Sequence, residues 1–101
     1  MLSLSMIVRD EAAQIEDCLR SVQGFVDEMV VVDTGSSDAT IAIAERLGAS
    51  VHRIDWPGDF APARNQALQW VSGDWVLVLD ADEQLRPEAR EPLQQLMARP
   101  E

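Results

Sequence analysis

The sequence predicts a single α/β domain built around a parallel β-sheet. Apolar segments at residues 2–8, 29–32, 49–54 and 75–79 alternate with segments whose apolar side chains recur at helical spacing. Strands and helices that alternate in this way form βαβ units, which give a parallel sheet with right-handed crossovers. The chain has 101 residues, 47% of them hydrophobic, so residues 1–101 have the size and composition of one folded domain.

The first strand leads into an amphipathic helix, which we expect over residues 11–22. Asp10 stands just before this helix and can serve as its N-cap. The apolar side chains of the helix recur every three or four residues and form one stripe: Ile15, Cys18, Leu19 and Val22. Since no candidate base accompanies Cys18, we expect a buried core thiol and not a nucleophile.

The composition excludes several classes of partner and of compartment. The formal net charge is −10, and all eight basic side chains are arginine. This acidic surface disfavours nucleic acid and anionic membranes, although it admits an anionic small ligand if a metal neutralises the charge. A single cysteine permits no internal disulfide and fits a reducing, cytoplasmic compartment. No signal peptide is evident, and no segment approaches the length of a transmembrane helix.

The second strand ends at polar residues that suit a ligand loop. Asp33 and Thr34 come directly after it, and Gly35 permits a tight turn or the close approach of a ligand. Ser37 or Asp38 can cap the helix that we expect next. The alternative is an ordinary turn between a strand and a capped helix, with no ligand.

The later elements follow the same alternation. The helix predicted after the third strand begins near Asp59, its expected N-cap, and its expected buried stripe is Ala63, Ala67, Leu68 and Val71. We expect His52 to be a strand residue and not a metal ligand, because the chain has no second histidine and no paired cysteine. A last helix starts at Pro87, and Pro92 should kink it or divide it into two pieces.

The fourth apolar segment, residues 75–79, stops abruptly at carboxylates. Its valines and leucines are typical of a strand that is buried on both faces. Asp80 and Asp82 then point to one side of the chain, about 6–7 Å apart if the backbone stays extended. Two such oxygen donors suit a hard divalent cation. The alternative is that these acids only end the strand and cap the next turn.

Four segments, in this order and spacing, resemble one known family. They are LSMIVRDE (4–11), VVVDTGSSDAT (30–40), DFAPARN (59–65) and GDWVLVLDADE (73–83). Together they resemble the N-terminal half of a family 2 glycosyltransferase, which has the Rossmann-like GT-A fold. The resemblance covers the chain to about residue 86.

The resemblance implies a function and a set of site residues. Enzymes of this family transfer a sugar from a nucleotide-sugar, often a UDP-sugar, to an acceptor hydroxyl, with inversion and with Mg²⁺ or Mn²⁺. By position, Asp82 resembles the metal ligand, and Asp80 the acid that contacts the ribose or the metal. Asp33 resembles the acid of the nucleotide pocket, Arg9 a residue placed against the base, and Arg64 a motif residue of the donor site.

Thr34 departs from the family pattern. Many members carry a second acid at this position, and it reads the uracil ring. Because a threonine stands at this position, the resemblance does not determine whether the nucleotide base is uracil or another base.

The resemblance also implies that residues 1–101 are a truncated donor-binding half. The general base of the family is an acid in the acceptor-binding half, which would lie beyond Glu101. We therefore expect this chain alone to be inactive, and expect its uncovered sheet to favour self-association. The alternative function is a non-catalytic nucleotide-sugar-binding or interaction module.

Two other classes of protein are disfavoured by specific residues. A phosphatase of the D-x-D-x-T class would use Asp80 as nucleophile and Asp82 as acid, but Gln84 stands where Thr or Val is needed. That class also uses a lysine, as does a receiver-type signalling domain, and the chain contains none.

Overall fold

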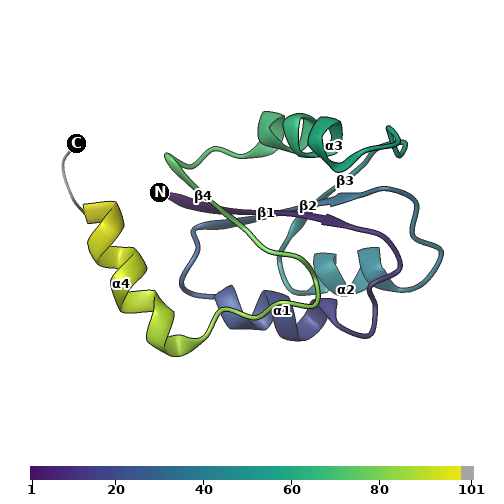
Figure 1. Ribbon diagram of the computed structural model, residues 1–101. Coiled ribbons are helices and arrows are strands. Elements are labelled where there is room, and N and C mark those ends of the chain that lie inside the picture. Colours follow the sequence, from purple (N-terminus) through teal and green to yellow (C-terminus); the bar gives the residue numbers. More distant parts are fainter. Residues whose placement is uncertain (99–101) are drawn as a thin grey trace.

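Four parallel strands form the sheet, in the order β3-β2-β1-β4. The structure is a computed structural model that describes residues 1–98 (Figure 1). The strands are β1 (Leu2–Val8), β2 (Glu28–Asp33), β3 (Ser50–Arg53) and β4 (Trp75–Val78). The helices are α1 (Ile15–Val22), α2 (Thr40–Arg46), α3 (Phe60–Ala67) and α4 (Pro87–Ala98), and a short 3-10 helix, η1 (Leu68–Trp70), follows α3. The predicted α/β class and parallel sheet are confirmed.

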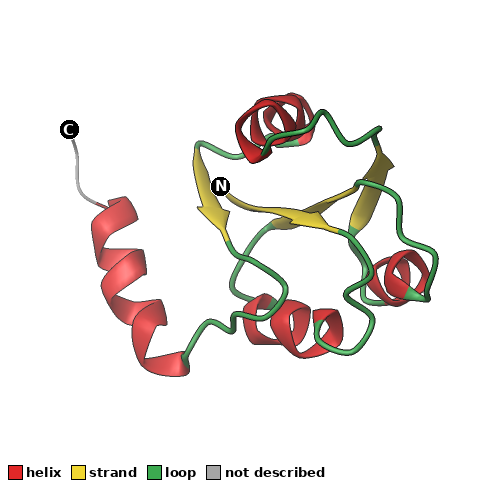
Figure 2. Cartoon of the chain, turned by 45° about the vertical axis from the view of Figure 1, so that its right-hand side comes forward, coloured by secondary structure: helices red, strands yellow, loops and turns green. Residues whose placement is uncertain are grey.

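Helices cover both faces of the sheet near its centre. α3 lies on one face, and α1 and α2 lie on the other (Figures 1 and 2). Because side chains alternate along a strand, β2 contributes Val31 to the core on the α1–α2 side and Val30 and Val32 to the core under α3. The larger core lies on the α1–α2 side and includes Leu4, Met6, Val8, Ile15, Cys18, Leu19 and Val22.

β4 is an edge strand, and the expectation that it is buried on both faces is wrong. Trp75, Val76 and Val78 are 36%, 37% and 52% exposed. β4 pairs only with β1, and its other edge has no partner among the described residues. The apolar composition of a strand shows that its side chains can be buried. Whether they are buried depends on whether another layer covers the strand.

Two helices begin without the N-caps that the sequence predicts. α1 starts at Ile15, four residues after the predicted start, and Asp10 is not its N-cap. Asp10 instead adopts a left-handed backbone conformation, with φ of 52°, which Asp tolerates better than most residues. α2 starts at Thr40 with Ala39 as its N-cap, so neither Ser37 nor Asp38 occupies the predicted cap position, although the Asp38 carboxylate accepts the Thr40 amide hydrogen at 2.9 Å.

The end of α3 also differs from its predicted stripe. Ala63 and Ala67 are buried as expected, but Leu68 is 52% exposed. The helix tightens into η1 at Leu68, and the tighter winding breaks the α-helical spacing on which the predicted stripe depends. Asp59 occupies the N-cap position of α3, although its side chain makes no capping hydrogen bond.

α4 stands away from the sheet (Figure 2), and Arg90 links it to α1 and to the loop after α1. Arg90 donates a hydrogen bond to the Ser21 carbonyl at 2.8 Å, and its guanidinium lies 5.5 Å from the centre of the Phe25 ring. The helix runs through Pro92 without the expected break. Pro92 is exposed, so water can bind the carbonyl that loses its helical partner. Within residues 1–98, no helix is long and apolar enough to span a bilayer.

His52 is a strand residue of β3, as predicted. Its ring stacks on Trp70 with the ring centres 4.3 Å apart and the planes at 9°. Trp70 packs against the core under α3, so His52 helps to close that core at the β3 edge.

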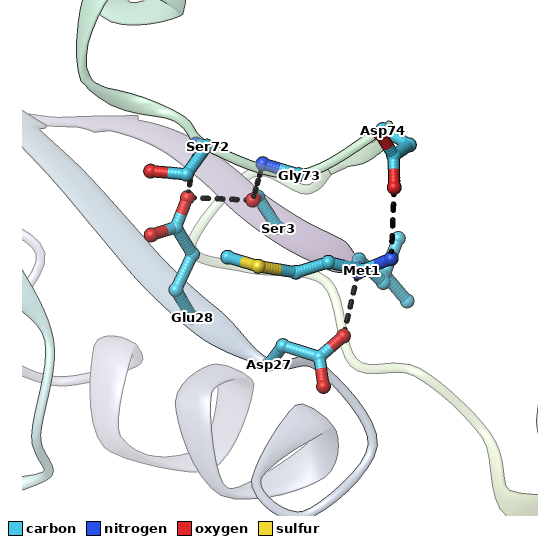
Figure 3. Close-up of polar contacts among 8 residues, drawn as sticks. Met1, Ser3, Asp27, Glu28, Ser72, Gly73 and Asp74 are labelled. Carbon is cyan, nitrogen blue, oxygen red and sulfur yellow. Dashed lines mark hydrogen bonds and ion pairs between the residues drawn. The ribbon is translucent and has the colours of Figure 1, made fainter.

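Hydrogen bonds join the start of β4 to β1 and β2 at the N-terminal edge of the sheet (Figure 3). Ser3, which is fully buried, accepts the Gly73 amide hydrogen at 2.8 Å and donates to the Glu28 carboxylate at 2.6 Å. The same carboxylate accepts the Ser72 amide hydrogen. The Ser3 hydroxyl, followed by the Ser72 amide, lowers the pKa of Glu28.

Substitution of Gly73 by alanine should destabilise this junction. The added Cβ would lie 2.5 Å from the Ser3 hydroxyl and 2.8 Å from the Met1 carbonyl oxygen. Overpacking of this kind costs about 1–3 kcal/mol. We expect urea unfolding to show that loss for Gly73→Ala and almost none for Gln69→Ala, an exposed control. Equal stability of Gly73→Ala and the parent would contradict the packing described here.

Candidate functional site

The carboxyl ends of β1, β2 and β4 meet at one edge of the sheet. From β1 the chain moves outward to β2 and β3, and then returns to place β4 on the other side of β1. The direction of winding therefore changes between β1 and β4. Ligands of open α/β sheets bind beyond the carboxyl ends of the strands at such a switch point.

Two adjoining cavities form a cleft at this edge. The smaller, about 230 Å³, is lined by Ile7, Val8, Arg9, Glu11, Thr34, Trp56 and Phe60. The larger, about 420 Å³, is lined by Ile7, Glu11, Gln14, Phe60, Arg64, Asp80, Ala81 and Asp82. Because Ile7, Glu11 and Phe60 line both, the two cavities are parts of one cleft.

Five of the six predicted site residues line this cleft. Arg9 and Thr34 line the smaller cavity, and Arg64, Asp80 and Asp82 line the larger one. Asp33, at the end of β2, is buried directly before Thr34. The sequence therefore placed these residues at one edge of the sheet, although it could not show which of them share a cavity.

Asp33 holds the loop after β2 and keeps one oxygen free. It is 1% exposed, and its Oδ1 accepts the amide hydrogens of Gly35 and Ser36, both at 2.8 Å. Gly35 has a φ of 127°, a conformation that glycine adopts readily and that turns these amides toward the carboxylate. The other oxygen, Oδ2, is buried and has no hydrogen-bond partner in the described part of the chain. Buried acceptors are rarely left unpaired in folded proteins, so Oδ2 marks this position as unusual.

Hydrogen bonds connect the loop after β1 to the loop after β2. The Asp10 carboxylate accepts the Ser37 amide hydrogen at 2.7 Å, and the Asp10 amide donates to the Ser36 hydroxyl at 2.8 Å. The Glu11 amide donates to the Thr40 hydroxyl at 2.8 Å. No local sequence pattern indicates these contacts, because the partners are 26–29 residues apart. They hold the two loops together on one side of the cleft.

The D-x-D acids lie in a turn and not in an extended strand. Pairing of β4 with β1 ends at Val78, so no neighbouring strand keeps the following residues extended. The Glu83 amide donates to the Asp80 carbonyl at 2.9 Å, and the Glu83 carboxylate accepts the Asp80 amide hydrogen at 2.8 Å. The spacing expected for an extended Asp80 and Asp82 therefore does not apply. Both side chains are exposed at the cleft.

The acids fit a cation that is held jointly with an anionic ligand. Among residues 1–98, no group of three or more His, Cys, Asp or Glu side chains is arranged to hold a metal ion. Mg²⁺ is commonly bound through one or two carboxylates together with substrate phosphates, so Asp80 and Asp82 are a suitable donor set.

Cys18 lies beneath the D-x-D turn as a buried thiol, as predicted. It is inaccessible to solvent, and its sulfur lies 3.6 Å from the Asp80 carbonyl oxygen. Burial, and then the charges of Glu83, Asp82 and Asp80, raise the pKa of the thiol to about 12.

Trp56 and Phe60 are cleft residues that the sequence analysis missed. Both line the smaller cavity, and Phe60 also lines the larger one. The available signal was a pair of large aromatic side chains around a Pro-Gly turn, where exposed aromatics have no core to fill.

The model of glycosyl transferase family 2 matches residues 3–101. The chain belongs to glycosyltransferase family 2. The resemblance based on the four sequence segments is therefore confirmed.

Relatives and solved structures agree with this family. A TPR repeat-containing protein of Synechococcus elongatus is 53% identical over 100 residues, which are 99% of this chain and 25% of that protein. Mannosyl-3-phosphoglycerate synthase of Rubrobacter xylanophilus has a TM-score of 0.81 and 26% identity, covering 99% of this chain and 37% of that one. Glucosyl-3-phosphoglycerate synthase of Mycobacterium tuberculosis, crystallised with Mn²⁺ and UDP-glucose, has a TM-score of 0.72 and 29% identity, covering 81% of this chain and 33% of that one.

The chain spans about a quarter to a third of the length of the curated relatives it matches. Each solved structure is also about three times as long as the part that this chain covers.

The raised pKa of Cys18 makes stability fall at alkaline pH. The thiol is neutral in both folded and unfolded chains below pH 9, and above that value only the unfolded chain ionises until the pH approaches 12. The chain has no lysine or tyrosine, so no other side chain titrates in this interval. We expect the free energy of unfolding to fall by about 1.4 kcal/mol per pH unit.

Urea unfolding of the parent and of Cys18→Ala across this pH range measures the effect. The substitution should lower stability at neutral pH, because it leaves a small cavity, but should remove most of the alkaline slope. A parent without that slope would show that the thiol ionises normally in the fold.

Proposed function

We propose that this chain is the donor-binding part of a glycosyltransferase and that its cleft binds a nucleotide-sugar, with a UDP-sugar as the first candidate. The observation that carries the proposal is the position of Asp33. Its buried Oδ2, which has no hydrogen-bond partner within residues 1–98, lies at the same sheet edge as the exposed acids Asp80 and Asp82. Asp33 lines neither cavity, but it directly precedes Thr34, which lines the smaller one, so it places an acceptor next to the nucleoside end, while Asp80 and Asp82 place cation-binding oxygens at the diphosphate end.

The smaller cavity takes the nucleoside in this proposal. Asp33 Oδ2 accepts a hydrogen bond from a hydroxyl or N–H group of the nucleoside, which satisfies the buried oxygen. Arg9 and Thr34 line this cavity and contact the base, and Asp33 lies behind Thr34, its neighbour in the chain. Support comes from the M. tuberculosis glucosyl-3-phosphoglycerate synthase, which was crystallised with UDP-glucose and is 29% identical over the matched region.

The larger cavity takes the diphosphate and a divalent cation, Mg²⁺ or Mn²⁺. Asp80 and Asp82 would hold the cation, and the Arg64 guanidinium lines the same cavity. A bound cation would act as a Lewis acid that stabilises the charge of the leaving diphosphate. The net charge of −10 makes this neutralisation important, because the acidic chain otherwise repels a diphosphate.

The reaction that fits this donor site is glycosyl transfer. The bond between the sugar carbon and the diphosphate oxygen breaks, and the acceptor hydroxyl oxygen bonds to that carbon with inversion. The acceptor proton passes to a general base, and the diphosphate leaves with the bonding electrons. The general base and the acceptor site are expected in the part of the family's proteins that this chain does not span, so we expect donor binding without transfer.

Asp82 should control cation-dependent binding. Calorimetric titration of the parent with UDP should show higher affinity when Mn²⁺ is present. Asp82→Asn should remove most of this gain, about 100-fold or more, since even residues that only orient a metal ligand are worth about 10- to 100-fold in metal affinity. Asp74→Asn is the matched control, because Asp74 is exposed at the opposite edge of the sheet. Equal Mn²⁺ dependence in Asp82→Asn and the parent would refute the assigned cation site.

Asp33 should control the nucleoside end of the cleft. Asn at this position keeps an acceptor for the Gly35 and Ser36 amides but replaces the free oxygen by a donor. Asp33→Asn should weaken UDP binding about 10- to 100-fold, the value of one hydrogen bond to a charged group, and leave binding of inorganic pyrophosphate with Mn²⁺ unchanged. Loss of both ligands to the same extent would place Asp33 outside the nucleoside end.

A further inference from the structure

Two aromatic side chains stand exposed at the nucleoside end of the cleft. Trp56, in the loop between β3 and α3, is 39% exposed, and Phe60, the first residue of α3, is 55% exposed. Both line the smaller cavity together with Arg9 and Thr34. Large aromatic surfaces left in contact with water on a cleft wall are typical of ligand-binding positions.

The two rings are held in place before any ligand binds. Their centres lie 5.0 Å apart with the planes at 74°, an edge-to-face contact. The Arg64 guanidinium lies 5.6 Å from the centre of the Phe60 ring, on the side of the larger cavity. A ring fixed in this way loses little freedom when a flat ligand stacks on it.

The other tryptophans have different roles in the fold. Trp70 stacks on His52 and packs against the core under α3. Trp75 begins β4 and lines a separate cavity with Met1 and Asp74, at the opposite edge of the sheet. Trp56 is thus the tryptophan that lines the cleft.

Thr34 limits how strongly the cavity can hold a base by hydrogen bonds. Its hydroxyl donates to the Val8 carbonyl at 3.2 Å, so only the lone pairs of its oxygen face a ligand. A neutral oxygen is a weaker acceptor than a carboxylate. An interaction with the face of the base can therefore add affinity beyond the hydrogen bonds of Thr34 and of the Asp33 acceptor.

We propose that Trp56 and Phe60 form a stacking wall for the nucleobase of the donor. This inference rests on the proposed function, because it assigns a role within the same donor site. Because the two ring planes lie at 74°, the base stacks on the face of Trp56 and meets Phe60 at its edge, and the Thr34 oxygen accepts a hydrogen bond from the base. Every base has a flat π-face, so the wall supplies affinity without selecting the base. Selection is left to Thr34 and Arg9.

The two residues should be separable, because Trp56 lines only the smaller cavity and Phe60 lines both. Trp56→Ala should weaken UDP binding about 5- to 150-fold, the loss expected for one base–aromatic stack, and leave pyrophosphate binding unchanged. Trp56→Phe should restore most of the affinity. Phe60→Ala should weaken both ligands.

The experiment titrates this chain with UDP and with inorganic pyrophosphate, each in the presence of Mn²⁺. Trp75→Ala is the matched control, since Trp75 is 36% exposed and lies at the other edge of the sheet. Tryptophan fluorescence gives a second readout in the unmodified chain. UDP should quench the emission of the parent and of Trp75→Ala, whereas pyrophosphate should not.

The outcomes separate this inference from the proposed function. If the parent binds neither UDP nor pyrophosphate, both are overturned. If UDP binds but Trp56→Ala weakens it no more than Trp75→Ala does, only the stacking wall is overturned. Equal loss of UDP and pyrophosphate in Trp56→Ala also overturns the wall, because it indicates general damage to the cleft. If Trp56→Ala fails to fold, Trp56→Phe and the quenching of the parent still decide the question.

Discussion

The burial of β1 between two neighbouring strands and two helical layers is the constraint on which the rest of the structure depends. Leu4 and Met6 are almost completely buried, and β1 pairs in parallel with β2 on one side and with β4 on the other. Its register places Val8 opposite Asp33 and Ser5 opposite Val78. Since a slip of one residue would turn the apolar side chains of β1 to the wrong faces, this packing also fixes where the site acids emerge.

The site combines a rigid side with an open one. On the rigid side, Asp33 holds the backbone of its own loop, and Asp10 joins the loops after β1 and β2. On the open side, Asp80 and Asp82 lie in a short turn beyond an exposed edge strand. The nucleoside end of the proposed donor site therefore rests on more fixed contacts than the cation end. A cation held jointly with a diphosphate would supply part of the order that the turn itself lacks.

Side chains of β4 and α4 are exposed because no other layer of the described residues covers them. Val78 and Leu96 are about half exposed, although both belong to patterns that are typical of buried faces. Self-association through this surface remains a prediction. The exposed aromatics at the cleft have another origin, because an edge-to-face contact and an arginine hold them at a cavity rim and not at an uncovered core. Apolar side chains of this domain are therefore exposed for two different reasons: some belong to a surface that no layer covers, and others line the rim of a cavity.

The sequence by itself determined the strands and helices, the family, and the sheet edge that carries Asp33, Asp80 and Asp82. These features depend on periodicity and on motif order along the chain, which are local properties. Only the tertiary structure decided that β4 lies at an edge, that the D-x-D acids turn, and that Asp10 binds the loop after β2 instead of capping α1. It also decided that Trp56 shares a cavity with Thr34. These four features depend on contacts between segments far apart in the chain or on the absence of a covering layer. Such contacts and such an absence produce no local pattern in the sequence.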